Sequence, residues 1–302
     1  MITFIYAVLV FQVLRFSVTL FNFLSNPKLG YYGKHFSDPL SIIISGRREE
    51  AEELLQSISE QDYTNIEVFF KDEQDENVLL QKASGRYFLF IDAASTVKTG
   101  LFNNLIQRMR VFDLDLLSLI PNRQPVGFFE HCTLPLQELL LLNLFPLRFV
   151  GLNNALALSL VNKSCVFYNA QRYRLQHRGL QESDSLKMKT EILLANRFID
   201  AKSHLGIADQ SQLLLRTLGR SIPVTLVYLL LTLAGPVFMI FYFDFSFLLL
   251  PVGLIFLSRI MISFLTRQNP LINLILHPLQ MLMLAVLLLR ASWKKVFTPV
   301  QH

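Results

Sequence analysis

Long apolar runs at both ends of the chain enclose a middle segment in which charged residues are frequent. Residues 1–24 are nearly all apolar, and a helix of that length crosses a hydrocarbon layer of about 30 Å at about 1.5 Å per residue. The run has neither a basic start nor a small-residue cleavage site, which favours a retained membrane anchor over a signal peptide. Three further apolar runs occupy residues 222–243, 245–264 and 271–289. The pattern predicts one N-terminal and two to three C-terminal transmembrane helices.

Three of the apolar runs contain an ionisable residue: Arg15 in the first, Arg259 in the third and His277 in the last. A charged residue inside a span either marks a functional site or pairs with a neighbouring helix. The basic residues after the last run, from Arg290 to Lys295, pose a topological problem. If the middle segment is cytoplasmic, three complete C-terminal crossings would leave this tail outside, against the positive-inside tendency. One of the last two runs is therefore expected to be re-entrant or interfacial.

Between the membrane segments, short β-branched or aromatic runs alternate with stretches whose apolar residues recur at helical spacing. Four strands are predicted, at residues 41–45, 66–70, 87–91 and 114–120, with helices at 47–60, 77–83 and 101–111. Such alternation is typical of βαβ units, so we expect an α/β fold with a mostly parallel, Rossmann-like sheet. Its ligand crevice should lie beyond the carboxyl ends of the strands.

The middle segment also contains a Leu-rich stretch at residues 135–149. It is too short to cross a bilayer, so the pattern predicts an interfacial helix laid along the membrane. Three parts follow from these patterns: an anchor at residues 1–24, a cytoplasmic α/β domain at 25–220, and C-terminal transmembrane or re-entrant helices with a basic tail at 221–302.

The composition agrees with a soluble domain tied to a lipid bilayer. Of the 302 residues, 52% are hydrophobic and 26 are Phe, which is too apolar for one soluble domain. The formal net charge of +5 suits a protein that faces anionic lipid. No basic stripe with interleaved aromatic residues favours a nucleic-acid partner. The two cysteines, Cys132 and Cys165, are too few for a disulfide scaffold, which indicates a reducing compartment.

Arg47, Asp72 and Asp92 fall at the carboxyl ends of the first three predicted strands. Asp92 is the most informative of them, because a strand that ends in Asp-x-Asp is a place to hold a divalent metal. Two carboxylates and the oxygens of a diphosphate together complete the shell of a hard cation. Here Ala94 occupies the second carboxylate position. The remaining carboxylate alone should hold such a cation poorly.

Several segments appear in the order of the motifs of membrane-bound family 2 glycosyltransferases, which the chain resembles from about residue 41 to residue 295. Residues 41–50 (SIIISGRREE) resemble the first strand with its P-A-R-N-E-E turn, and residues 61–68 (QDYTNIEV) resemble Q-D-Y-P-N-x-E-V. Residues 83–92 (ASGRYFLFID) resemble A-x-G-E-x-L-L-F-L-D, and residues 292–295 (SWKK) resemble the W-K-G-R after the last membrane segment.

The resemblance implies a GT-A fold and inverting transfer of a sugar from a nucleotide-sugar donor. In that reaction a carboxylate base deprotonates the acceptor hydroxyl, and Mg²⁺ or Mn²⁺ held by Asp-x-Asp neutralises the departing diphosphate.

The chain departs from this family at the positions that carry the chemistry. Where the family has Asp-Asp after the second strand, the chain has Lys71-Asp72, which leaves only Asp72 to contact the nucleotide. The family's Glu-Asp pair maps onto Glu182-Ser183-Asp184 in two alignments. In one alignment Ser183 replaces the base, and in the other Asp184 is the base. Glu182 is the alternative base, and both acids also suit the solvated start of a helix.

Basic residues on the same crevice offer a route without a metal. Arg47 and Lys71 could pair with the phosphates of a donor, as guanidinium and ammonium groups do at many phosphate sites. The alternative is that both are ordinary loop cations.

Two hypotheses follow. The first is an active transferase that moves a sugar from a nucleotide donor, with Mg²⁺ or Mn²⁺, to a lipid or polyprenyl acceptor at the cytoplasmic face of a bacterial inner membrane. The second is a glycosyltransferase-like pseudoenzyme that needs no cofactor and serves as an accessory or scaffolding subunit beside a protein partner in a membrane complex. Because three motifs are degraded together, the sequence favours the second hypothesis.

Overall fold

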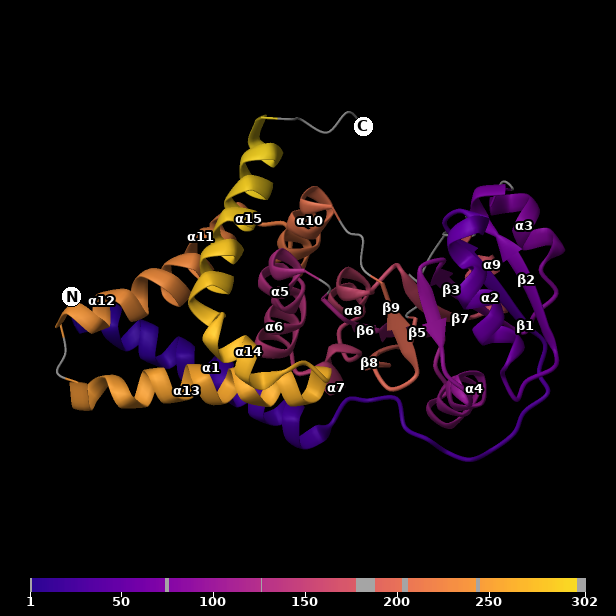
Figure 1. Cartoon of the computed structure of the whole chain (residues 1–302), viewed down its shortest axis with the longest axis horizontal. Helices are drawn as coiled ribbons and strands as arrows, with labels where there is room; N and C mark the ends of the chain where they lie inside the picture. The colour runs from indigo at the N-terminus through magenta and orange to yellow at the C-terminus, as the bar shows by residue number, and fades with distance from the viewer. Residues whose placement is uncertain are drawn as a thin grey trace. The chain divides into compact units, whose positions relative to one another are not determined.

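The computed structural model describes residues 2–73, 76–125, 127–177, 188–202, 206–242 and 245–297. The chain divides into two compact units that alternate along the sequence (Figure 1). The helical unit comprises Met1–Asn26, Pro125–Pro146 and His204–His302, and the α/β unit comprises Pro27–Gln124 and Leu147–Ser203. Along the sequence, the two segments of the α/β unit therefore separate the three segments of the helical unit.

The α/β unit is built on a six-stranded sheet with the order β2-β1-β3-β7-β5-β8. Its strands are β1 (Leu40–Ser45), β2 (Ile66–Phe70), β3 (Tyr87–Asp92), β5 (Leu116–Ile120), β7 (Cys165–Asn169) and β8 (Thr190–Leu194). β1 runs parallel to β2 and β3, β5 runs parallel to β8, and β7 is antiparallel to its two neighbours. The predicted α/β class with a mostly parallel sheet is confirmed.

A second sheet of three short strands extends the α/β unit, with the order β4-β9-β6. These strands are β4 (Ser95–Val97), β9 (Ile199–Ala201) and β6 (Asn122–Arg123). The helices of the unit are η1 (Arg48–Ala51), α2 (Glu52–Ser59), η2 (Lys71–Glu73), α3 (Glu76–Lys82), α4 (Leu101–Phe112), α7 (Leu147–Val150), α8 (Asn154–Leu160) and α9 (Ala170–His177).

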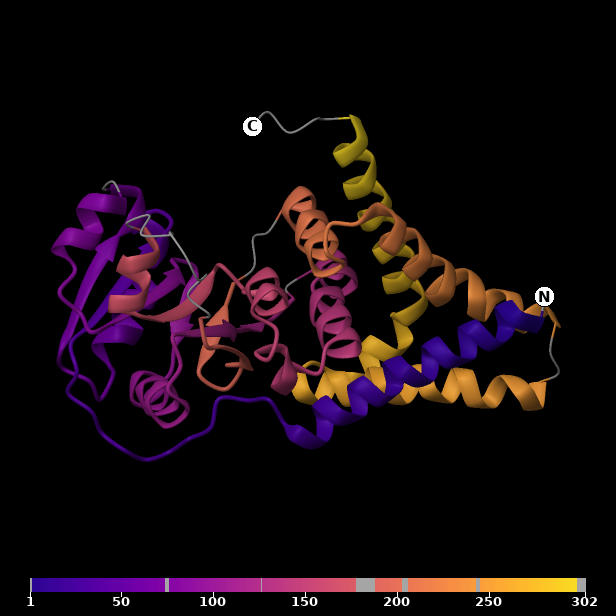
Figure 2. The ribbon, with the colours of Figure 1, turned by 180° about the vertical axis from the view of Figure 1, so that it is seen from behind.

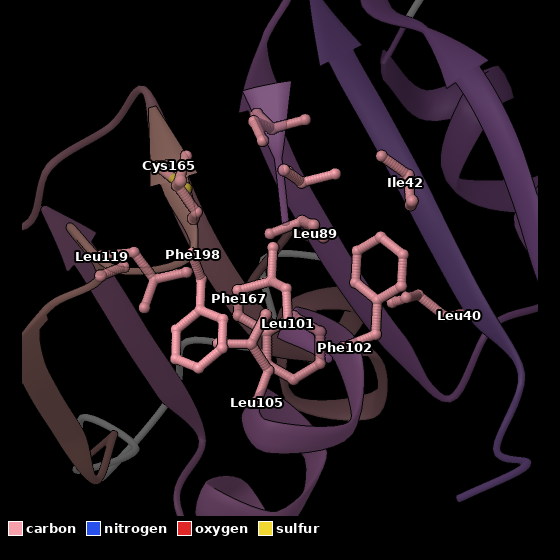
Figure 3. Packing of buried hydrophobic residues seen from close by; sticks show 14 of the residues in the cluster. Leu40, Ile42, Leu89, Leu101, Phe102, Leu105, Leu119, Cys165, Phe167 and Phe198 are labelled. Atoms are coloured by element: carbon pink, nitrogen blue, oxygen red, sulfur yellow. The ribbon is translucent and has the colours of Figure 1, made fainter. Parts of the chain in front are cut away.

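Both faces of the large sheet are buried, which explains why its strands read as continuous apolar runs. Successive side chains of a strand point to opposite faces. Leu40 and Ile42 of β1 accordingly pack with Phe102 of α4 on one face (Figure 3). Ile43 of β1 and Phe88 of β3 belong to a separate apolar cluster with residues of α3 and α9. Helices therefore cover both faces of the sheet, and the carboxyl ends of the strands remain uncovered at one edge of it.

Among the described residues of the helical unit, three segments are long and apolar enough to cross a membrane: Ile2–Ser25, Ile222–Tyr242 and Phe247–Thr266. The helices of the unit are α1 (Ile2–Ser25), α5 (Phe128–Thr133), α6 (Pro135–Leu144), α10 (Ile207–Thr217), α11 (Ile222–Leu229), the π-helical turn η3 (Leu230–Ala234), α12 (Gly235–Tyr242), α13 (Phe245–Thr266), α14 (Pro270–Ile275) and α15 (His277–Phe297). The prediction of one N-terminal and two C-terminal apolar helices is confirmed. The last apolar run is instead divided between α14 and α15, which meet at Leu276.

The three apolar segments alternate in direction. The rings of Phe4 and Phe238 lie 5.7 Å apart and those of Phe11 and Tyr228 lie 6.1 Å apart, so α1 is antiparallel to the segment formed by α11, η3 and α12. α13 runs in the same direction as α1, as Figures 1 and 2 show. Because the three segments alternate in direction, the end of α1, the start of α11 and the end of α13 lie at one end of the helical unit.

The basic tail lies on that same side. Lys295 Nζ in α15 donates a hydrogen bond to the carbonyl of Arg220, just before α11, at 2.6 Å. Three crossings would place this tail on the side of the middle segment, in line with the positive-inside tendency, and the number of crossings stays a prediction.

The Leu-rich stretch at residues 135–149 forms two helices, α6 and α7, and Pro146 separates them. α6 belongs to the helical unit, where the amide of Asn22 in α1 donates to the carbonyls of Leu142 and Phe145, each at 2.8 Å. Its orientation along a membrane surface stays a prediction.

Candidate functional site: the carboxyl ends of β1, β2 and β3

The parallel register brings three turns to one edge of the sheet. Ser45 of β1 lies beside Asp92 of β3, and Ile44 of β1 lies beside Phe70 of β2. The turns that follow, residues 46–48, 71–73 and 92–94, therefore sit next to one another, and we call them the strand-end rim. The rim brings together four of the site residues predicted from sequence: Arg47, Lys71, Asp72 and Asp92.

Asp92 is exposed at the last position of β3, and its side chain closes the turn that follows. One carboxylate oxygen accepts the N–H of Ala94 at 3.0 Å. The backbone of the turn is also engaged, since Ala93 N–H donates to Ser45 C=O and Ala94 C=O accepts from Lys202 N–H, each at 2.8 Å. The turn thus joins β1, β3 and the segment after β9.

Gly46 and Ala93 set the distance between the turn at residues 46–48 and the turn at residues 92–94. Gly46 has φ +115°, a conformation that L side chains rarely adopt, and a Cβ built there would lie 2.9 Å from Ala93 Cβ. A glycine is therefore required opposite the alanine. This contact positions the backbone of the Asp92 turn.

The cations of the rim pair with neighbouring acids. Arg47 Nε donates to Glu50 Oε1 at 2.9 Å, and hydrogen bonding to Glu50 raises the pKa of its guanidinium. The Arg47 side chain is nevertheless 75% exposed. Arg48 pairs with Glu73 at 3.8 Å, which links the turn after β1 to the turn after β2. A phosphate ligand would have to compete with these carboxylates for the guanidinium groups.

The other two rim residues differ in exposure: Asp72 is exposed and Lys71 is half-buried. Within the part of the chain that the structure describes, no group of three or more His, Cys, Asp or Glu residues is arranged to hold a metal ion. Glu182 and Asp184, the candidate bases, lie outside the described residues, and their roles stay predictions.

Asp200 is a polar residue near this edge that the sequence analysis missed. It lies in β9 opposite Thr96 of β4, the strand that follows the Asp92 turn. Its carboxylate accepts from Asn122 Nδ2 at 2.6 Å and pairs with Lys98 Nζ at 2.5 Å. The long-range pairing of β9 with β4 and with β6 brings these groups together, so no local motif marks them.

Buried Cys165 lies close to Asp92 but is chemically inert. Burial, with a smaller contribution from the Asp92 charge, raises the pKa of its thiol to about 12. A thiol with such a pKa stays protonated at neutral pH and is a poor nucleophile.

At the other ends of these strands, the carboxylate of Glu67 accounts for two of the motifs in the sequence, residues 61–68 and residues 83–92. Glu67 of β2 accepts hydrogen bonds from the N–H groups of Ser84 and Gly85 and from Ser41 Oγ. Burial acts to raise the pKa of Glu67, but these hydrogen bonds outweigh it and the net pKa is lowered. A Cβ at Gly85 would lie 2.6 Å from the Ser41 nitrogen, so glycine is required there. Glu67 and Gly85 therefore serve the fold.

Comparison with known proteins gives similarity to solved structures alone. No protein-family model matches the chain, and no curated protein matches it. The chain is similar to a mannosyltransferase, PcManGT from Pyrobaculum calidifontis in complex with GDP-Man and Mn²⁺, with a TM-score of 0.46 and 11% identity over 98% of this chain and 100% of that chain.

It is also similar to S. aureus TarS 1-349 in complex with UDP-GlcNAc, with a TM-score of 0.36 and 10% identity over 84% of this chain and 89% of that chain. Neither similarity assigns a ligand or a residue role to this chain.

Proposed function

We propose that the chain is an integral membrane protein whose glycosyltransferase-like α/β domain no longer transfers sugar, and that it acts as an accessory or scaffolding subunit of a membrane assembly. The turn after β3 carries this proposal. Its one carboxylate, Asp92, accepts the N–H of Ala94, and its backbone bonds to Ser45 and Lys202. The turn holds strands together and lacks the paired carboxylates that metal-assisted departure of a diphosphate needs.

Two replacements elsewhere support the same proposal. Lys71 occupies one of the two acidic positions expected after β2, so Asp72 alone remains for a nucleotide. Ser183 interrupts the acidic pair at 182–184, and a hydroxyl is not a general base near neutral pH. Together with the lost carboxylate in the turn after β3, these replacements affect three parts of the reaction: donor binding, charge neutralisation and deprotonation of the acceptor.

We place the protein in a bacterial inner membrane with the α/β unit on the cytoplasmic side. The basic tail supports this orientation, because Lys295 bonds to Arg220 at the end of the helices where α1 finishes and α11 begins. Basic segments tend to remain on the cytoplasmic side. The lipid bilayer is then one partner and a protein of the assembly is the other.

The alternative function is inverting transfer of a sugar from a nucleotide-sugar donor to a lipid or polyprenyl acceptor. The exposure of Asp72 and Asp92 on one rim favours it. In that case Asp184, or Glu182, would be the base and Asp72 would contact the nucleotide. Asp92 with Mg²⁺ or Mn²⁺, or else Arg47 and Lys71, would meet the diphosphate.

Transfer assays in native membranes test the proposal. Membranes that contain the overproduced protein are incubated with radiolabelled UDP- and GDP-sugars, and label in the lipid fraction is counted. We expect the same incorporation from wild type, Asp92→Asn, Asp184→Asn and membranes without the protein. Incorporation above that background, lost by about 100-fold or more in Asp184→Asn but kept in the exposed-acid control Glu52→Gln, would establish the active alternative.

A further inference from the structure

Two cavities follow one another along the seam between α1 and α13 in the helical unit. One is lined by Ile2, Ile5, Tyr6 and Leu9 of α1, with Met239 of α12 and Phe247 and Leu250 of α13. The other is lined by Gln12 and Arg15 of α1, Leu139 and Asn143 of α6, Leu254, Ile255 and Ser258 of α13, and His277 of α15. Because α1 and α13 run in the same direction, the two cavities occupy successive turns of the same pair of helices.

The first cavity is apolar and has the size of a ligand site. Its volume is about 450 Å³, and Tyr6 supplies the one polar side-chain atom among its lining residues. Ligand pockets commonly have volumes of about 300–1,000 Å³. A cavity with this lining between two membrane-spanning helices suits a hydrocarbon chain.

The second cavity is small, polar and incompletely satisfied. Its volume is about 20 Å³, more than the roughly 10–15 Å³ that one water needs. Gln12 is only 4% exposed, yet neither atom of its amide has a hydrogen-bond partner, and His277 Nδ1 has none either. Buried polar atoms are rarely left unpaired, so the amide of Gln12 and His277 Nδ1 are free to hydrogen-bond a group that enters the cavity.

Two guanidinium groups lie beside the second cavity, and one buried carboxylate, that of Glu138 just before Leu139 of the lining, interacts with the second of them, Arg259. Arg15 uses Nε to bond Asn143 and lies 5.6 Å from the ring centroids of Phe11 and Tyr228. No carboxylate of the described residues lies within ion-pair distance of it. Arg259, which follows Ser258 of the lining, is fully buried with Nε and Nη1 unpaired. Since Glu138 offsets the charge of Arg259, Arg15 is the cation that an anion in the cavity would balance.

We propose that the α1–α13 seam binds an anionic lipid through its phosphate. Phosphate oxygens accept hydrogen bonds from Arg15 and the Gln12 amide, and one hydrocarbon chain occupies the apolar cavity between Leu9 and Ile2. From Arg15 to Ile2 the helix advances about 20 Å at about 1.5 Å per residue, a length that suits one lipid chain. The second cavity is small, so a headgroup larger than the phosphate extends beyond it. This inference concerns the helical unit and does not rest on the proposed function.

The test uses the full chain in a neutral detergent. Native mass spectrometry and thermal unfolding are followed on addition of phosphatidic acid, phosphatidylcholine, diacylglycerol or inorganic phosphate. We expect phosphatidic acid to bind saturably and to raise the unfolding temperature. The other three probes should each give a smaller effect. Equal effects of phosphatidic acid and phosphatidylcholine would overturn the proposal, and so would a full effect of inorganic phosphate alone.

Variants locate the site. Arg15→Gln should weaken phosphatidic acid binding by about tenfold or more, because a hydrogen bond to a charged group is lost. Arg290→Gln, which removes an exposed cation of α15 outside the cavity, is the matched control and should bind like wild type.

Gln12→Leu keeps the test decisive if Arg15→Gln does not fold. It removes an unpaired buried amide, so it should leave the lipid-free protein at least as stable as wild type while it weakens binding. Leu9→Trp should fill the apolar cavity and weaken binding without touching the polar one. Wild-type affinity in Gln12→Leu, or in Leu9→Trp, contradicts the assigned position of the phosphate or of the chain. None of these outcomes depends on whether the α/β unit binds a nucleotide.

Discussion

At the scale of single residues, Glu67 shows how one carboxylate holds three strands together. It accepts hydrogen bonds from Ser41, Ser84 and Gly85, which belong to β1 and to the turn before β3. Its lowered pKa means that the ionised form is the one that the folded state prefers. The stabilisation is therefore present above the ordinary carboxyl pKa of 4.5 and is lost as the pH falls through the lowered folded value.

Glu67→Gln should reduce stability by about 1 kcal/mol near neutral pH, because the charge-assisted hydrogen bonds are lost. The difference between wild type and variant should shrink when the pH is lowered below the folded pKa of Glu67. Thermal unfolding in detergent, recorded from neutral to acidic pH, measures this difference. The matched control Glu52→Gln, an exposed acid of α2, should behave like wild type. A Glu67→Gln effect that is constant with pH would show that its charge contributes nothing.

Gly46 and Ala93 make a second prediction at this scale. Gly46→Ala should destabilise the protein by about 1–3 kcal/mol, since φ +115° strains any L residue and the new methyl group meets Ala93 Cβ. Gly127→Ala is the control, because nothing lies within 4 Å of a Cβ at that position and its φ is −121°. Unfolding temperatures of the two variants measure the contrast. Equal stabilities of Gly46→Ala and Gly127→Ala would mean that the fold does not require the close contact between residues 46 and 93.

At the scale of elements, the turn after β3 decides whether the rim can hold a cation. Ala94→Asp places a second carboxylate two residues after Asp92, at a half-buried position. We expect this variant to bind Mn²⁺ measurably more tightly than wild type, because two carboxylates share the ion. Electron paramagnetic resonance of free Mn²⁺ measures the binding, and Ala94→Asn is the control without added charge. Wild-type binding as tight as that of Ala94→Asp would mean that other groups already hold the metal.

The elements also show how far the sequence could be interpreted. The strand predicted at residues 66–70 is confirmed without change, and the strands at 41–45 and 87–91 each gain one residue. These strands could be predicted from the sequence because both faces of the sheet are buried, which makes each strand a continuous apolar run. β7, which inserts antiparallel between β3 and β5, was not predicted. Its position depends on pairing with Tyr87–Ile91 about 80 residues earlier, which no local pattern records.

The candidate site was predictable only in part, for a related reason. Arg47, Asp72 and Asp92 follow strands, so their meeting at one edge could be inferred from the βαβ pattern. That the Asp92 carboxylate closes its own turn could not be inferred from the sequence, because this hydrogen bond depends on the path from β3 into β4. Nor could the pairing of Asp200 with Lys98, which requires the second sheet.

At the scale of the whole molecule, the number and direction of the apolar helices determine where the ends of the chain lie. The sequence left the crossings unresolved because it could not tell that α14 and α15 meet at Leu276. We expect three alternating crossings, which would place Ile2 on one side of the membrane and the basic tail on the other.

Labelling with a membrane-impermeant maleimide tests this topology in sealed vesicles. Cysteines are introduced one at a time at exposed positions, as Ile2→Cys, Lys34→Cys and Lys294→Cys. We expect Lys34→Cys and Lys294→Cys to react from the same side and Ile2→Cys from the opposite side. The native cysteines are buried and give a low background in the unsubstituted control. Reaction of Lys294→Cys from the side of Ile2→Cys would require a fourth crossing.

Nucleotide binding shows whether the α/β unit has lost its donor site. Calorimetry on the detergent-purified chain with UDP, GDP, UDP-GlcNAc and GDP-mannose, each with and without Mn²⁺ or Mg²⁺, measures this binding. We expect no saturable binding up to about 1 mM ligand; a dissociation constant of that size corresponds to about −4 kcal/mol. Saturable, metal-dependent binding that is lost in Asp92→Asn or Asp72→Ala would contradict this expectation.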